Sequence, residues 1–138
     1  MSAIVIVDTN VVVAGFPMRR TDLPLAGILQ GMLCATFPFA VSGLLLAEYR
    51  DVLGRPKLQT LHELEDGGVE SLVADIARHA IVVTPAASPP APDPGDQMLW
   101  DLLAARADLV LVTSDKRLLR DRTMRGRVIT PQAFLAAD

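Results

Sequence analysis

The stretch that decides the fold is Ala3-Ile4-Val5-Ile6-Val7-Asp8-Thr9-Asn10. Its apolar run ends in four β-branched residues, which is typical of a strand buried on both faces of a parallel sheet. A polar triplet follows at the carboxyl end of this strand, where open α/β sheets bind ligands. The run is too short for a signal peptide or a membrane span, so we expect a cytoplasmic protein without a membrane partner.

Outward from this strand, short apolar runs alternate with helical patterns. Because the strands are apolar throughout, the alternation predicts a three-layer α/β/α fold around a central, mainly parallel sheet. The 138 residues, of which 51% are hydrophobic, fit a single domain over residues 1–138. Further strands are predicted at residues 39–41, 81–83, 109–112 and 128–129, and helices at 11–16, 23–33, 43–53, 61–80, 95–107, 116–124 and 131–137.

Composition excludes several classes of protein. The net charge of -3 argues against a generally basic nucleic-acid binder. No glycine-rich phosphate loop follows the first strand, which argues against dinucleotide or nucleoside-triphosphate binding. The single cysteine, Cys34, rules out an internal disulfide or a cysteine zinc site and is expected to be a small core residue. Five prolines between Pro85 and Pro94 predict an extended loop.

Two acids lie at predicted strand ends. Asp8 ends the first strand, and Asp115 follows the strand at residues 109–112. Carboxyl ends of parallel strands share one edge of a sheet, so these side chains are expected near each other. Each could instead cap the helix that follows it, which is a common role for aspartate.

Glu48 stands in an apolar part of the helix at residues 43–53. At helical spacing its neighbours include Leu44 and Val52. A glutamate on a core-facing stripe costs free energy unless its charge is compensated. The nearby Arg50 and Arg55 lie on another face of the helix, so a metal or a shared polar site explains Glu48 better than a salt bridge.

Asp96 has two possible roles that can hold at once. Asp93-Pro94 predicts a helix cap followed by proline at the first helical position. Asp96 then occupies the acidic position of a capping box. It also shares a stripe with Leu99 and Trp100 and therefore faces inward.

Four carboxylates on converging elements repel one another, and a divalent cation relieves this repulsion. With no histidine or cysteine ligands at hand, oxygen-only ligation favours Mg²⁺ or Mn²⁺ over zinc. Such ions assist the attack of water on phosphodiesters. The sequence therefore predicts a catalytic metal site built by Asp8, Glu48, Asp96 and Asp115.

A basic run follows Asp115 directly and contains six of the 13 Lys and Arg residues. It is predicted to hold a phosphate backbone beside the metal. The alternative is an ordinary solvated helix face. Its members are Lys116, Arg117, Arg120, Arg122, Arg125 and Arg127.

Four blocks of this sequence resemble the PIN-domain nuclease family, and in order and spacing they cover nearly the whole chain. The Arg-Pro-Lys element in the second block resembles one subgroup of the VapC-like toxins of bacterial toxin–antitoxin pairs. The blocks are Val7-Asp8-Thr9-Asn10-Val11; Ser42 through Ala47-Glu48, with Val52-Leu53 and Arg55-Pro56-Lys57-Leu58; Asp93-Pro94-Gly95-Asp96, with Leu99 and Ala107-Asp108; and Leu111-Val112-Thr113-Ser114-Asp115.

The resemblance implies Mg²⁺- or Mn²⁺-dependent RNA cleavage, a homodimer and a small cognate antitoxin protein. It implies catalytic or metal-binding roles for the four acids, and an orienting role for Asn10, Thr113 and Ser114. The family often has several acids around the third block, but here Gly95 and Gln97 flank Asp96. Asp93 is a candidate to supply the missing charge. Within the basic run, Lys116, Arg117 and Arg120 are the expected RNA contacts.

Two other functions fit parts of the pattern. A haloacid-dehalogenase-type phosphatase also has an aspartate after its first strand, and Gly95-Asp96 with Asp101 mimics a later motif. That class needs a second acid at the position of Asn10, where this chain has none. A non-catalytic PIN-like module that only binds RNA or protein is the other alternative.

Overall fold

The computed structural model of the chain describes residues 3–15, 24–56, 66–124 and 126–136. Strands and helices alternate along these residues, as the sequence predicts. The elements are β1 (Ile4–Val7), α1 (Thr9–Ala14), α2 (Pro24–Cys34), β2 (Ala40–Val41), α3 (Gly43–Leu53), α5 (Asp66–His79), β3 (Ile81–Val82), the 3₁₀ turn η1 (Pro94–Asp96), α6 (Gln97–Ala105), β4 (Leu109–Val112), α7 (Lys116–Arg120), β5 (Val128–Ile129) and α8 (Pro131–Ala136).

All the described strands are parallel. β1 pairs with β4 along its full length, and β4 pairs with β5. β2 pairs with β3, and a parallel bridge between Val5 and Phe39 joins this pair to β1. The spatial order is therefore β3-β2-β1-β4-β5, which confirms the predicted parallel sheet.

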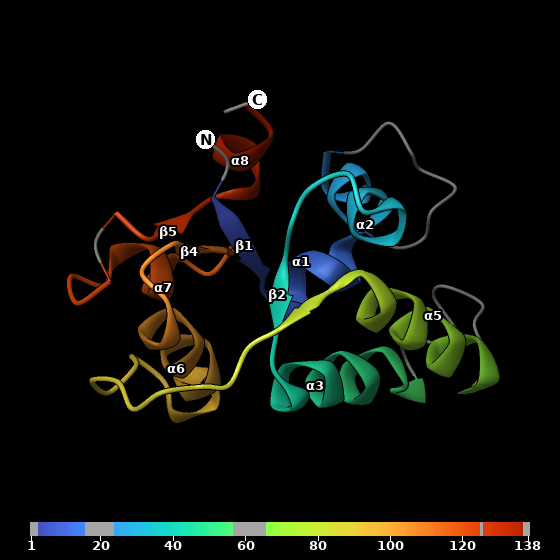
Figure 1. Cartoon of the computed structure of the whole chain (residues 1–138), viewed down its shortest axis with the longest axis horizontal. Helices are drawn as coiled ribbons and strands as arrows, with labels where there is room; N and C mark the ends of the chain where they lie inside the picture. The colour runs from blue at the N-terminus through green and yellow to red at the C-terminus, as the bar shows by residue number, and fades with distance from the viewer. Residues whose placement is uncertain (1–2, 16–23, 57–65, 125, 137–138) are drawn as a thin grey trace.

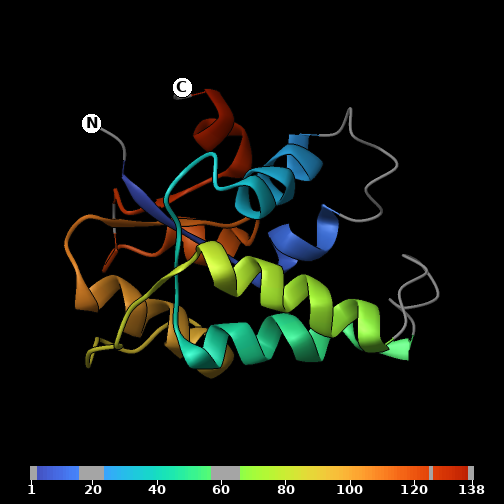
Figure 2. The ribbon, with the colours of Figure 1, turned by 45° about the vertical axis from the view of Figure 1, so that its right-hand side comes forward.

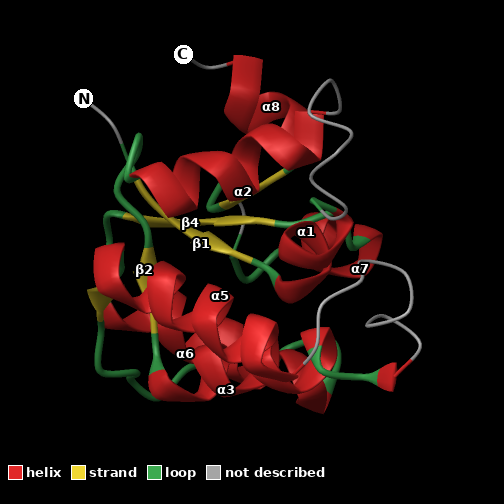
Figure 3. Ribbon diagram, turned by 90° about the vertical axis from the view of Figure 1, so that its right-hand side faces the viewer, coloured by secondary structure: helices red, strands yellow, loops and turns green. Residues whose placement is uncertain are grey.

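Helices cover both faces of this sheet. α2 and α8 lie on one side of β1 and β4, whereas α3 and α6 lie on the other (Figure 1, Figure 3). α5 runs alongside α3 (Figure 2) and also packs against α2. This is the predicted three-layer α/β/α arrangement.

The core explains why the apolar runs become strands. Ile6 and Val7 of β1 and Leu111 and Val112 of β4 are fully buried, because helices shield both faces of the central strands. Trp100 of α6 is also fully buried. No helix within the described ranges is long and apolar enough to cross a membrane.

Side-chain caps fix the start of two elements, and one of them confirms the cap predicted at Asp93-Pro94. The Ser42 hydroxyl accepts a hydrogen bond from the amide of Leu45 at 3.1 Å and so caps α3. Asp93 caps η1 by accepting from the Gly95 amide at 2.8 Å, with Pro94 at the first helical position. These caps fix where α3 and η1 begin.

Three local predictions are wrong. The helix at residues 116–124 ends at Arg120, because Asp121 is extended and its carboxylate accepts the Thr123 amide at 2.9 Å. The helix at residues 95–107 starts as the 3₁₀ turn η1 and ends at Ala105. Cys34 is exposed rather than buried, because it lies at the very end of α2.

Candidate functional site

Asp8 and Asp115 lie at the carboxyl edge of neighbouring strands, as predicted. Asp8 follows β1 directly, and its backbone amide donates to the carbonyl of Val112 at the end of β4. The Thr113 hydroxyl donates to Asp8 Oδ2 at 2.6 Å and accepts from the Asp115 amide at 3.0 Å. The Thr113 hydroxyl therefore connects the side chain of Asp8 to the backbone of Asp115.

The Asp8 carboxylate is buried, with only 6% of the residue exposed. It forms no side-chain cap on α1, so the capping alternative does not apply to it. Burial raises the pKa of Asp8 to about 6, and the charges of Asp96 and Glu48 add to the rise, against the hydrogen bond from Thr113.

Glu48 reaches the same edge from α3. The Thr9 hydroxyl, directly after Asp8, donates to Glu48 Oε2. The adjacent Tyr49 is fully buried, and its hydroxyl donates to the Val7 carbonyl at 2.5 Å. Burial raises the pKa of Tyr49, and the charges of Asp8 and Glu48 raise it further. Two successive residues of α3 thus attach this helix to the start of α1 and the end of β1.

Asp96 lies at the start of α6 and is half-buried. It makes no side-chain cap hydrogen bond, so the capping-box role is not formed. Burial raises the pKa of Asp96, and the negative charges of Asp115 and Asp93 raise it further, whereas Arg117 acts in the opposite direction. None of the described side chains donates a hydrogen bond to this carboxylate, which therefore lies in the field of the other acids.

Asp115 differs from the other acids because it has a cation beside it. Asp115 Oδ1 accepts from the Arg117 amide at 2.9 Å, so Asp115 does cap α7. The Arg117 guanidinium lies 3.3 Å from Asp115 Oδ2 and 3.4 Å from Asp93 Oδ2. Burial acts to raise the pKa of Asp115, but the bonds and charge of Arg117 outweigh it and lower the pKa.

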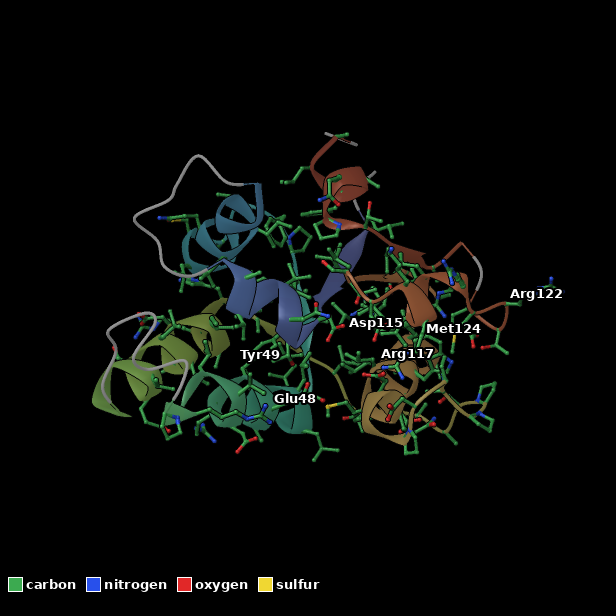
Figure 4. The ribbon with its side chains drawn as sticks, turned by 180° about the vertical axis from the view of Figure 1, so that it is seen from behind. Glu48, Tyr49, Asp115, Arg117, Arg122 and Met124 are labelled. Atoms are coloured by element: carbon green, nitrogen blue, oxygen red, sulfur yellow. The ribbon has the colours of Figure 1, made fainter. Side chains whose placement is uncertain are left out.

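Figure 4 shows Glu48 on α3 and Asp115 before α7 on either side of the same central region, with Arg117 beside Asp115. The charges of the four acids act on one another, and two of them have raised pKa values. Their oxygen donors suit Mg²⁺ or Mn²⁺. Yet among the described residues no three metal-ligating side chains are close enough to hold an ion as they stand. The donor set fits a divalent cation in kind, while Thr9 and Arg117 occupy oxygens of Glu48 and Asp115.

Comparison with known protein families gives one match, to the PIN domain over residues 4–117. The chain belongs to the PIN-domain family. PIN domains are generally nucleases that use divalent metals, and the matched range contains Asp8, Glu48, Asp96 and Asp115. None of the curated proteins compared with the chain matches it.

The other predicted site residues of this PIN domain differ in their exposure and hydrogen bonding. Among residues that the structure describes, neither Asn10 nor Ser114 has a side-chain hydrogen-bond partner, and both are exposed. Lys116 and Arg120 are also exposed, which suits a contact with RNA. The role of each in binding or orientation stays a prediction.

The described members of the basic run do not form one surface on this PIN domain, and Arg125 lies outside the described residues. Arg117 reaches the acids, whereas Arg122 projects outward at the periphery (Figure 4). Arg127 lies at the opposite edge of the sheet, where its guanidinium donates to the carbonyls of Arg106 and Leu109 at 2.6 and 3.0 Å. Arg127 is thus a structural residue, and the prediction of one continuous basic run beside the metal is wrong there.

Sequence reasoning missed Thr9 and Tyr49. Thr9 holds Glu48, and its only sequence signal is its place next to Asp8. Tyr49 could have been found from its spacing with Leu45 and Leu53, which forms the buried stripe of α3.

Proposed function

We propose that this PIN domain is a Mg²⁺- or Mn²⁺-dependent endoribonuclease and the toxin of a toxin–antitoxin pair. The observation that carries the proposal is the edge at which β1, α3, α6 and β4 bring Asp8, Glu48, Asp96 and Asp115 into one electrostatic field. Buried and mutually repelling carboxylates favour binding of a divalent cation.

Each residue has a distinct part in the proposed reaction. The four acids hold the cation, and Asp93 can add a further oxygen at the outer side. A bound Mg²⁺ or Mn²⁺ polarises a phosphoryl oxygen and makes water a stronger nucleophile. Thr113 fixes the Asp8 carboxylate, and Thr9 fixes that of Glu48. The exposed Lys116 and Arg120 hold the RNA backbone.

Cleavage is expected by direct attack of water on phosphorus. The new P–O bond forms as the bond to the 3′ oxygen breaks, and that oxygen takes up a proton. The products therefore carry a 5′-phosphate and a 3′-hydroxyl.

The deciding experiment is cleavage of end-labelled RNA in Mn²⁺, in chelator, and with the Asp8→Asn variant. We expect cleavage only by the unmodified chain in Mn²⁺, because the variant loses one carboxylate charge but keeps an oxygen for Thr113. Asp108→Asn is the matched control, since Asp108 is exposed and precedes β4 at the other edge of the sheet. Full activity in Asp8→Asn would refute the proposal.

The toxin role requires a protein that covers the site. Leu44 lies one helical turn before Glu48 and is 64% exposed, so an apolar residue stands beside the acids. Such a surface suits a small antitoxin that inserts next to the site, and we also propose a homodimer. We expect expression of the chain alone to arrest growth, and co-expression of a small upstream reading frame to restore it. Light scattering measures the oligomeric state.

A non-catalytic PIN-like module is the second candidate. It is favoured by the finding that, within the described part of the chain, no three side chains converge as metal ligands. Calorimetry separates the two candidates. Normal RNA binding without any Mn²⁺ binding would favour the module, whereas Mn²⁺ binding that Asp8→Asn abolishes supports the enzyme.

A further inference from the structure

Arg117 occupies the outer part of the acidic cluster. Its guanidinium spans Asp115 at 3.3 Å and Asp93 at 3.4 Å, two residues that come from separate elements. Its own backbone amide holds the second oxygen of Asp115 at 2.9 Å. Both carboxylate oxygens of Asp115 are therefore engaged by one residue of the same chain.

This contact divides the acids into two groups. Asp115 and Asp93 face the positive charge of Arg117, whereas Asp8, Glu48 and Asp96 have no cation within salt-bridge distance among the described residues. The unbalanced negative charge thus lies on the inner side, next to β1 and α3. An incoming divalent cation would meet no competing cation of the described chain at the inner acids, which accept hydroxyl hydrogen bonds from Thr113 and Thr9, whereas Arg117 engages both oxygens of Asp115.

The ion pair is suited to exchange. The Arg117 side chain is 62% exposed, and each of its two contacts is a single pair of atoms longer than 3.2 Å. Ion pairs of this kind on a protein surface contribute little free energy, so another cation can replace them at small cost. The cap from the Arg117 amide to Asp115 does not depend on the guanidinium and survives such an exchange.

We propose that Arg117 is a built-in competitor of the metal: its guanidinium must leave Asp115 before that carboxylate can join a divalent cation. This rests on the proposed function, because it concerns access to the same metal site. Release of Arg117 would also place a free guanidinium beside the acids, where an RNA phosphate is the natural new partner. Binding of metal and binding of RNA would then favour each other through one side chain.

Isothermal titration of metal-free protein with MnCl₂ at physiological salt tests this directly. Arg117→Gln should bind Mn²⁺ about fivefold more tightly than the unmodified chain, in line with the loss of weak surface ion pairs. Arg122→Gln is the matched control: it removes the same charge from an exposed residue that follows the same helix, but Arg122 has no salt bridge to any described residue. We expect its affinity to stay within about twofold of the unmodified protein, because salt screens charges that are not in contact.

The possible outcomes distinguish failure of this inference from failure of the proposed function. Unchanged or weaker Mn²⁺ binding in Arg117→Gln overturns the inference, provided that the unmodified chain binds Mn²⁺ and Asp8→Asn does not. An equal gain in both arginine variants also overturns it, since the effect would then be one of general charge. Absence of Mn²⁺ binding in the unmodified chain and in every variant overturns the proposed metal site and the inference together. Circular dichroism verifies that the variants are folded.

Discussion

We expect the charged Asp8 carboxylate to lower the stability of the metal-free protein above pH 6, because burial raises its pKa. Its pKa lies near 3.8 in an unfolded chain and at about 6 in the folded protein. Between these values the folded state keeps a proton that the unfolded state loses. The contribution of Asp8 to the free energy of unfolding is therefore greatest below pH 3.8 and falls as the pH rises to 6.

Replacing Asp8 with asparagine should consequently stabilise the protein in chelator at pH 8. The expected gain is about 2 to 3 kcal/mol, from roughly two pKa units. Urea unfolding of both proteins at pH 8 and at pH 4.5 measures it, and the gain should shrink sharply at the lower pH. A variant that is less stable at pH 8 would show that the charge of Asp8 is not destabilising.

At the residue level, sequence reasoning placed Glu48 correctly for a reason that was partly wrong. Leu44 was expected to face the core on the same stripe, but it is 64% exposed. The buried stripe of α3 is Leu45, Tyr49 and Leu53, and Glu48 lies at its border. Helical periodicity alone cannot tell the edge of a buried face from its centre, because the neighbouring elements set that border.

Gln97 lies beside Asp96, where related sequences often have an acid, and its side chain has a structural role. Its side chain turns toward the proline-rich loop, where Nε2 donates to Ser88 Oγ at 2.8 Å and Oε1 accepts from the Ala91 amide at 2.9 Å. The Ser88 hydroxyl also donates to Asp101 at 2.7 Å. The loop that leads to Asp93 is thus tied to α6, and Asp101 is used there rather than in a phosphatase-like site.

We expect Gln97→Ala to loosen this loop without unfolding the domain. The exchange rate of the Ala91 amide should rise about fivefold to tenfold, as the loss of a hydrogen bond worth about 1 kcal/mol implies. The Ala86 amide is an internal control, because it bonds to the Asp101 backbone carbonyl. Gln132→Ala, at an exposed position of α8, controls for the substitution itself. Hydrogen exchange by NMR measures both amides, and unchanged exchange at Ala91 would contradict the role of Gln97.

Elements were predictable to different degrees. β1 and β4 follow directly from their apolar runs, because strands covered on both faces need continuous burial. The ends of α6 and α7 were not predictable, because local hydrogen bonds such as that of Asp121 to the Thr123 amide decide them. The contact of Arg117 with Asp93 joins residues 24 apart, and no spacing rule indicates it.

Across the molecule, the sheet holds both halves of the chain together. The bridge between Val5 and Phe39 links β2 to β1, and the buried residues form one contiguous core. The fold class was predictable because alternation and burial are global properties. The position of Asp8 and Asp115 at strand ends was predictable. The hydrogen bond of Thr9 to Glu48 and the ion pair of Arg117 with Asp115 were not, because they depend on side-chain contacts.

A single core predicts cooperative unfolding of the whole chain. Trp100 is the only tryptophan, is fully buried, and donates to Thr123 at 3.3 Å. Its fluorescence reports on the C-terminal half, whereas far-ultraviolet circular dichroism reports on all helices. We expect the two urea transitions to coincide, as in two-state unfolding. Separate midpoints would mean that the halves unfold independently and that residues 1–138 are not one unit.

The hydrogen bond from Thr113 to Asp8 joins two residues that are 105 positions apart in the sequence. A chain still on the ribosome, synthesised only as far as α6, already contains Asp8, Glu48 and Asp96. It has neither β4 to pair with β1 nor the threonine and aspartate that follow β4. The proposed cleavage site is therefore completed only once β4 and the residues that follow it have been synthesised, although three of its four acids are made earlier.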